Sequence, residues 1–82
     1  MSVNHVRLTD HARERIIGRK IPHRAIWGAL DRPFTTRPLP GGREVRTVPA
    51  RLRSRRAWVS VVVERMGPDD VRVITAYPRG HR

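Results

Sequence analysis

Three side chains that can act on a phosphodiester recur at four-residue spacing near the start of the chain: His11, Arg15 and Arg19. On a helix, this spacing places them on one side, at the border of the apolar stripe. An imidazole exchanges protons near neutral pH, and guanidinium groups neutralise phosphate. Metal-independent RNA cleavage needs a base, an acid and positive charge for the phosphorane. The same pattern is also typical of an ordinary solvated helix face, so the spacing alone leaves both interpretations open.

Further candidates lie on predicted strands. Thr75 and Tyr77 alternate in "VITAYP", which predicts that they share one face, together with Val71 and Val73. A hydroxyl can hold a phosphate oxygen, and a tyrosine ring can stack on a base. Both residue types are also simply favourable in strands.

The second predicted strand carries Arg43 and Arg46 on opposite faces. At least one of these arginines therefore faces any cleft on the sheet. Each of the glutamates Glu44 and Glu64 is a possible base but is better explained as a partner of arginines.

Positive charge dominates the composition. The 82 residues include 18 Lys and Arg against 7 Asp and Glu, a net charge of +11, and Lys20 is the only lysine. Arginine has a planar fork that suits phosphate and stacks on bases. The densest cluster lies at 51–56, where we expect a phosphate-backbone patch formed by Arg51, Arg53, Arg55 and Arg56. The excess of arginine is explained either by the codon usage of a GC-rich genome or by a partner, and that partner would be RNA or an acidic protein.

Other classes of function find no support in the sequence. The chain has no cysteine, and its histidines lack metal-ligand spacing. No apolar run approaches the roughly 20 residues that span a bilayer, and the first residues lack the apolar segment of a secretory signal. We therefore expect no metal, no small-molecule cofactor and no membrane partner. The expected location is cytoplasmic, with delivery as part of a larger effector as an alternative.

The periodicities predict one α+β domain over residues 1–82, with two N-terminal helices packed on a four-stranded antiparallel sheet. Thr9 is the expected N-cap of the first helix. The predicted helices cover 8–21 and 21–30, and the predicted strands cover 34–38, 43–48, 57–64 and 71–78. Residues 1–7 are expected to be an extended lead-in, and 50–56 a basic loop.

Four segments in this order resemble a bacterial family of domains of unknown function: "HARERIIGRKI", a second short helix ending in "ALDRP", "GGREVR" and "VITAYP". Typical members begin with a His-Ala-x-x-Arg-x-x-x-Arg-x-Ile helix and finish on a strand close to Val-Thr-x-Tyr-Pro. The family is similar to the RelE- and BrnT-like toxins, within the barnase/EndoU/RelE group of metal-independent ribonucleases. The resemblance covers Leu8 to Pro78.

This resemblance implies a RelE/barnase-like fold and a toxin-like endoribonuclease that cleaves mRNA or tRNA. It also implies an acidic antitoxin or immunity protein as partner. The chain departs from the family pattern in its shortage of lysine. An arginine that replaces the lysine of the family's cleft does not give up protons as lysine can. The catalytic residues that the resemblance implies are His11, Arg15, Arg43 with Arg46 as a near alternative, Thr75 and Tyr77. We expect Arg19 and the arginines of 51–56 to bind nucleic acid.

Two other functions fit the same residues. In a non-catalytic nucleic-acid-binding module, the arginines hold phosphates and Tyr77 or Trp58 stacks on bases. In a basic adaptor, the charge binds an acidic protein surface. Formation of RNA cleavage products separates the first interpretation from both alternatives.

Overall fold

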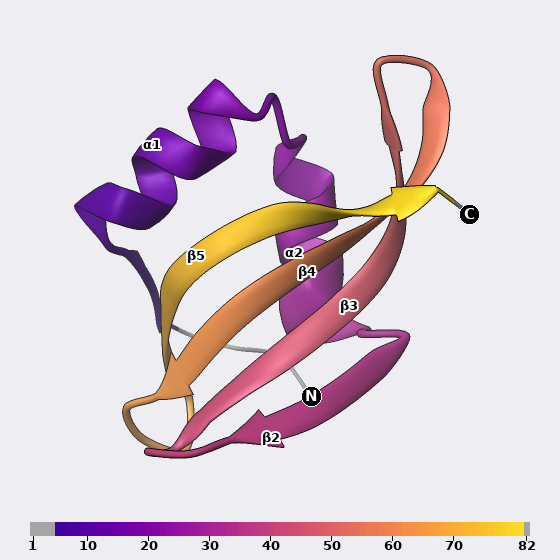
Figure 1. The fold of residues 1–82 in the computed structure, drawn as a ribbon. Helices are drawn as coiled ribbons and strands as arrows, with labels where there is room; N and C mark the ends of the chain where they lie inside the picture. The colour runs from indigo at the N-terminus through magenta and orange to yellow at the C-terminus, as the bar shows by residue number, and fades with distance from the viewer. Residues whose placement is uncertain (1–4, 82) are drawn as a thin grey trace.

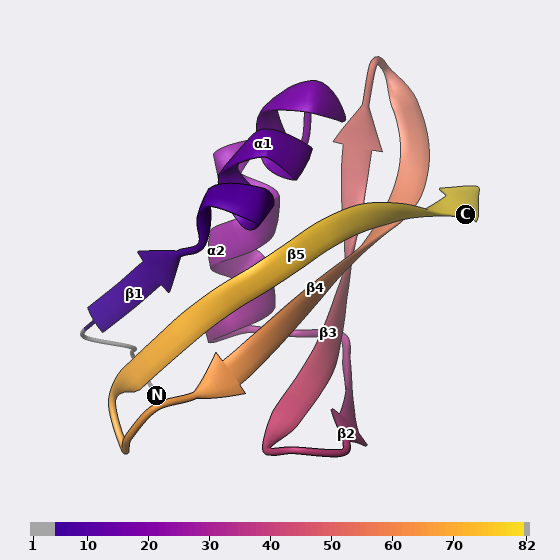
Figure 2. The same ribbon diagram turned by 60° about the vertical axis from the view of Figure 1, so that its left-hand side comes forward.

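The computed structural model describes residues 5–81, which form seven elements (Figure 1). In chain order these are β1 (His5–Leu8), α1 (Asp10–Gly18), α2 (His23–Asp31), β2 (Thr35–Leu39), β3 (Arg43–Leu52), β4 (Arg55–Arg65) and β5 (Asp70–His81). The strands form one sheet in the order β1-β5-β4-β3-β2. Both helices lie on the same side of β3, β4 and β5 (Figure 2). The prediction of an α+β domain with two helices on a sheet is confirmed.

The sheet differs from the prediction in its first strand. Residues 5–7, expected to be a lead-in, and Leu8, expected to begin the first helix, form β1. This strand pairs parallel with β5 from His5↔Asp70 to Leu8↔Val73. The described sheet is therefore five-stranded and mixed, and the prediction of four antiparallel strands is wrong in this respect. A four-residue strand is too short for alternation to reveal it, and its partner lies at the other end of the chain.

The core lies between the helices and the sheet. Val59, Val61 and Val63 alternate along β4, so they share one face of the strand, and all three are fully buried. α1 packs on β5 and adds Ala12 and Ile16 to the same buried cluster, to which α2 adds its own apolar side. Full burial of one valine contributes about 1.5–3 kcal/mol, so these central residues supply much of the stability of a small domain.

Thr9 fixes the start of α1 and attaches it to β5. Its hydroxyl oxygen accepts the N–H of Ala12 at 3.0 Å, which confirms the predicted N-cap. The same hydroxyl donates to the carbonyl of Ile74 at 3.1 Å, and the Thr9 N–H donates to the carbonyl of Val73 at 3.2 Å. One residue therefore sets both where the helix begins and where it lies on the sheet.

α1 ends in a Schellman motif that has lysine at the left-handed position. The N–H of Ile21 donates to the carbonyl of Ile16 at 3.0 Å, and the N–H of Lys20 donates to the carbonyl of Ile17 at 3.1 Å. Ile16 and Ile21 are both buried, which supplies the apolar contact that accompanies this motif. Lys20 has φ 54°, a conformation that glycine adopts without steric cost.

We expect Lys20→Gly to stabilise the protein by about 1 kcal/mol, because it removes the Cβ clash of a left-handed residue. The measurement is the free energy of unfolding in urea. Lys20→Ala removes the same charge but keeps the Cβ, so it should leave stability unchanged within about 0.5 kcal/mol. Equal stabilisation by both variants would show that charge, and not backbone strain, is the cause.

The β3–β4 hairpin is longer than predicted. The sequence suggests a basic loop over 50–56, but cross-strand pairs continue to Leu52↔Arg55 and leave a two-residue turn at Arg53 and Ser54. The prediction of a loop is wrong because a run of charged residues does not exclude a strand: long arginine side chains can reach water from a strand.

Candidate nucleic-acid interface

The sheet face without helices carries polar side chains in rows that cross the strands. Residues paired directly across antiparallel strands have side chains on the same face. The register defines a row of four hydroxyl residues: Thr35, Thr47, Ser60 and Tyr77. Within this row, Thr47 Oγ1 and Ser60 Oγ form a buried hydrogen bond of 3.1 Å. We call this surface the open face.

A β-bulge in β5 brings Thr75 and Tyr77 to the open face. Val73 pairs with Val63 and Thr75 pairs with Val62, so Ile74 is an extra residue in β5. The bulge reverses the alternation: Val73 faces the core, whereas Thr75 and Tyr77 face away from it. The prediction that Val71 and Val73 share a face with Thr75 and Tyr77 is therefore wrong, because strict alternation does not allow for an inserted residue.

An aromatic pocket adjoins the hydroxyl row. The rings of Phe34 and Trp58 lie 5.0 Å apart at an angle of 47°, and Phe34 is 67% exposed. Together with Thr35, Thr47 and Arg79 they line a pocket of about 270 Å³. An exposed ring beside hydroxyls and a guanidinium can stack on a base and hold its phosphate. Phe34 and Arg79 were missed in the sequence because their proximity depends on the register of four strands.

α1 packs against β5 near Thr75. β1 pairs with β5 only as far as Val73. Beyond that point, Arg19 Nη1 donates to the carbonyl of Ala76 at 2.8 Å. On α1, Arg15 lies about one turn before Arg19, and His11 about one turn before Arg15. We call these three residues the α1 edge.

The α1 edge is accessible. His11, Arg15 and Arg19 are all exposed. Among residues 5–81, neither His11 nor Arg15 forms a side-chain hydrogen bond or an ion pair. Their polar groups are therefore available to a ligand that reaches from the open face around the edge of β5.

Arg46 has a structural role on the helix side of the sheet. It is 7% exposed, and its Nη1 donates to the carbonyls of Leu30 at 2.7 Å and Ala29 at 3.5 Å. Its Nε donates to Glu44 Oε2 at 2.9 Å. Arg46 thus satisfies carbonyls at the end of α2, which a helix leaves without partners. This placement removes Arg46 from the residues that can contact a phosphate on the open face.

Arg43 lies on the open face within a charged row. Its Nε is 3.8 Å from Glu64 Oε2, while Arg72 Nη2 is 2.6 Å from Glu64 Oε1. One carboxylate is therefore shared by two partly exposed arginines, and the row keeps a positive charge that can bind an anion. The hydrogen bond from Arg72 is the main cause that lowers the pKa of Glu64, which makes Glu64 a poor base.

Glu44 is a second carboxylate held by arginines. Burial raises its pKa, but hydrogen bonds from Arg46 and Arg65 outweigh burial and bring the pKa below the ordinary value of 4.5. Both Glu44 and Glu64 therefore bind protons more weakly in the folded chain than in the unfolded chain. Their contribution to stability is present above the unfolded pKa and is lost as pH falls through the folded values.

We expect the double variant Glu44→Gln, Glu64→Gln to be less stable than the wild type at neutral pH. The difference in unfolding free energy should stay constant down to about pH 5 and then shrink on further acidification. Urea unfolding of both proteins across this pH range is the measurement. A difference that grows as pH falls below 4.5 would mean that these pKa values are raised and not lowered.

The arginines of 51–56 lie on the β3–β4 hairpin, which is distinct from the α1 edge. Arg51 and Arg56 form a cross-strand pair in continuation of the open-face rows. Arg53 occupies the turn, and Arg55 is paired with Leu52, whose side chain packs against the core. The structure therefore divides the predicted basic loop into two faces.

Among residues 5–81, no group of three or more His, Asp or Glu side chains is placed to hold a metal ion. No helix in this range is long and apolar enough to cross a membrane. Comparisons of the chain with models of protein families, with characterised proteins and with solved structures give no match.

Proposed function

We propose that this protein is a small metal-independent endoribonuclease that binds single-stranded RNA on the open face and cleaves it at the edge of β5. The observation that carries the proposal is the bulge at Ile74. It turns Thr75 and Tyr77 to the open face of β5, the strand on which α1 packs and to which Arg19 is hydrogen-bonded. Residue types suited to proton transfer, phosphate binding and base stacking therefore lie on β5 and on the helix that packs against it, which supports the proposal.

Each group has a proposed role. His11 acts as an acid or base in transfer of the ribose 2′-hydroxyl proton or of the leaving-group proton. Arg15 and Arg43 bind the phosphate and neutralise the charge that develops on it. Thr75 holds a phosphate oxygen, and Tyr77 stacks on the adjoining base.

The proposal extends to the fold group and to partners. The order of two helices followed by antiparallel strands supports a RelE/barnase-like arrangement, to which β1 is an addition. The net charge of +11 supports an acidic antitoxin or immunity protein that covers the basic surface. The proposed place of action is the cytoplasm, where mRNA and tRNA are found.

Incubation of the purified protein with mixed-sequence RNA in the presence of EDTA tests the proposal. We expect discrete fragments that end in 2′,3′-cyclic phosphate, because the attacking nucleophile is the 2′-hydroxyl. The measurement is separation of the products on a denaturing gel with analysis of their ends. RNA that is neither bound nor cut would contradict the proposal.

A second candidate is a non-catalytic module that binds single-stranded nucleic acid. The observation that favours it is the exposed Phe34 beside Trp58, which can stack bases without any chemistry. This candidate predicts binding of RNA and of single-stranded DNA without fragments. The same incubation, run with a binding assay, separates the two candidates.

A further inference from the structure

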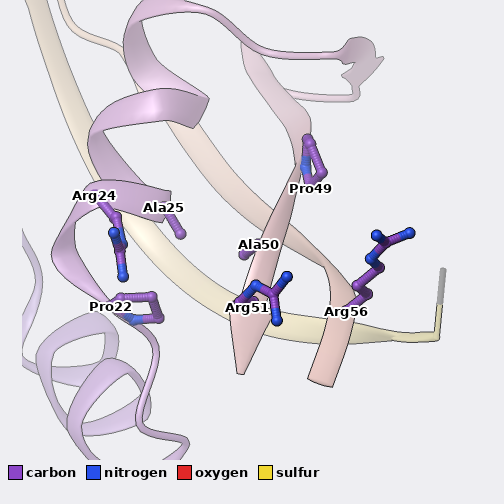
Figure 3. Close-up of a pocket in the computed structure, with 7 residues that line it drawn as sticks. All are labelled: Pro22, Arg24, Ala25, Pro49, Ala50, Arg51 and Arg56. Atoms are coloured by element: carbon purple, nitrogen blue, oxygen red, sulfur yellow. The ribbon is translucent and has the colours of Figure 1, made fainter. Parts of the chain in front are cut away.

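A second pocket lies between α2 and the β3–β4 hairpin and shares no lining residue with the aromatic pocket. It measures about 560 Å³. Arg24 on α2 and Arg51 on β3 stand on its two sides, with Ala25 and Ala50 between them, and Arg56 extends from β4 at its outer end (Figure 3). We call it the arginine pocket.

The three arginines of this pocket are not engaged by other groups. Arg24, Arg51 and Arg56 are all exposed. Within residues 5–81, none of them forms an ion pair or a side-chain hydrogen bond. No acidic residue lines the pocket. Its positive charge is therefore uncompensated, and an anion is the ligand that the pocket suits.

The hairpin that carries two of these arginines is built at a cost to stability. Arg51 and Arg56 are directly opposite each other, and like charges in that position destabilise a sheet. The turn places Arg53 at φ 51° and Ser54 at φ 66°, where glycine or asparagine is the usual choice. Such local costs in a small domain point to a function for the hairpin.

The arginine pocket continues the surface of the aromatic pocket. Pro49↔Trp58 and Arg51↔Arg56 are successive open-face pairs on the same hairpin. A strand rises about 3.3 Å per residue, so these two rows are roughly 6.6 Å apart. Beyond Thr47, β3 has no β2 residue beside it, and the pocket occupies this free edge. A strand of nucleic acid that leaves Phe34 can therefore pass directly over Arg51.

From these observations we propose that the arginine pocket binds the backbone phosphates of a single-stranded RNA where the strand leaves the aromatic pocket. This inference rests on the proposed function, because it takes RNA as the ligand. It adds a substrate class, which is single-stranded RNA long enough to span both pockets. It also adds a path for the RNA, which runs from β5 across the sheet toward α2. The positive end of the α2 dipole adds to the field that the arginines create.

The test uses the full-length double variant Arg24→Gln, Arg51→Gln and two single-stranded 2′-O-methyl RNAs, which cannot be cleaved through the 2′-oxygen. One RNA spans only the aromatic pocket, and the other extends past it. We expect the variant to bind the longer RNA about tenfold more weakly and the shorter RNA as tightly as the wild type does. The slope of log affinity against log salt for the longer RNA should decrease by about 1.4, which corresponds to two lost phosphate contacts.

The matched control is Arg13→Gln, Arg32→Gln, which removes the same charge from exposed positions outside the pocket. This control should bind both RNAs within twofold of the wild type. Equal losses of RNA affinity in both double variants would show that net charge is the cause and would overturn the inference. No loss of affinity in either double variant would overturn it as well. If the wild type binds neither RNA, the proposed function itself fails.

Discussion

Replacement of His11 by alanine is expected to lower the rate of RNA cleavage about 10²–10⁴-fold, the usual loss when a general acid or base is removed. His11 is exposed on α1, and alanine favours helix, so the fold should be unchanged. The measurement is the initial rate of cleavage in EDTA, with circular dichroism as the check on folding. RNA affinity should change little, because the phosphate-binding arginines remain.

His23→Ala is the control for this prediction. His23 is also an exposed histidine in a helix, but it lies in α2 beside an apolar pocket that includes Trp27 and Ile26. It should cleave at the wild-type rate. If His11→Ala cleaves as fast as the wild type, or if both variants lose activity equally, the role assigned to His11 is wrong.

Replacement of Arg46 by methionine is expected to destabilise the protein by about 3–5 kcal/mol, the usual cost of breaking a buried ion pair. Methionine keeps the volume of the side chain but leaves the Glu44 carboxylate without its buried partner. It also leaves the carbonyls of Leu30 and Ala29 without a donor. The measurement is the free energy of unfolding in urea. In so small a domain, this loss is a large part of the total stability.

Arg65→Met is the control, because Arg65 binds the same carboxylate from a position that is 46% exposed. It should cost no more than about 1 kcal/mol, as exposed ion pairs do. Equal losses in the two variants would mean that Glu44 pairing alone matters and that capping of α2 by Arg46 contributes nothing. A stable Arg46→Met protein that has lost RNA binding would return Arg46 to the phosphate-binding set.

Local signals predicted much of the fold. Thr9 was identified as an N-cap because a hydroxyl before an apolar helix is a strong local signal, and the structure has this cap. The strand at 57–64 was likewise predicted from its alternating valines, and the structure buries Val59, Val61 and Val63. Both features depend on residues close together in the sequence, where propensity and periodicity act.

The features that were missed depend on pairing between distant segments. β1 becomes a strand only because β5 offers it an edge, and the bulge at Ile74 depends on the register of β5 against β4. The family resemblance implies a phosphate-binding role for Arg46, and alternation on β3 shows only that Arg43 and Arg46 lie on opposite faces. Its capping of α2 appears only once helix and strand are brought together. Alternation in one strand therefore cannot separate a structural arginine from one that binds a ligand.

The candidate site also combines features that local signals predict with features that depend on pairing between distant segments. Residue types on α1 and β5 indicated phosphate chemistry, and the structure places those segments next to each other through Thr9 and Arg19. The aromatic pocket combines Phe34 with Arg79, which are 45 residues apart in the sequence. No local sequence pattern links two such residues, so the pocket could be found only from the pairing of the strands in the sheet.

The most direct test of the central claim is an NMR titration of the ¹⁵N-labelled wild-type protein with a 2′-O-methyl single-stranded RNA. The account predicts that amide shifts concentrate on Thr75 and Tyr77, on Thr47 and Ser60 of the hydroxyl row, and along the α1 edge. Shifts confined to β1 and the outer side of α2, with Thr75 and Tyr77 unaffected, would contradict it and would place any RNA site elsewhere on the molecule.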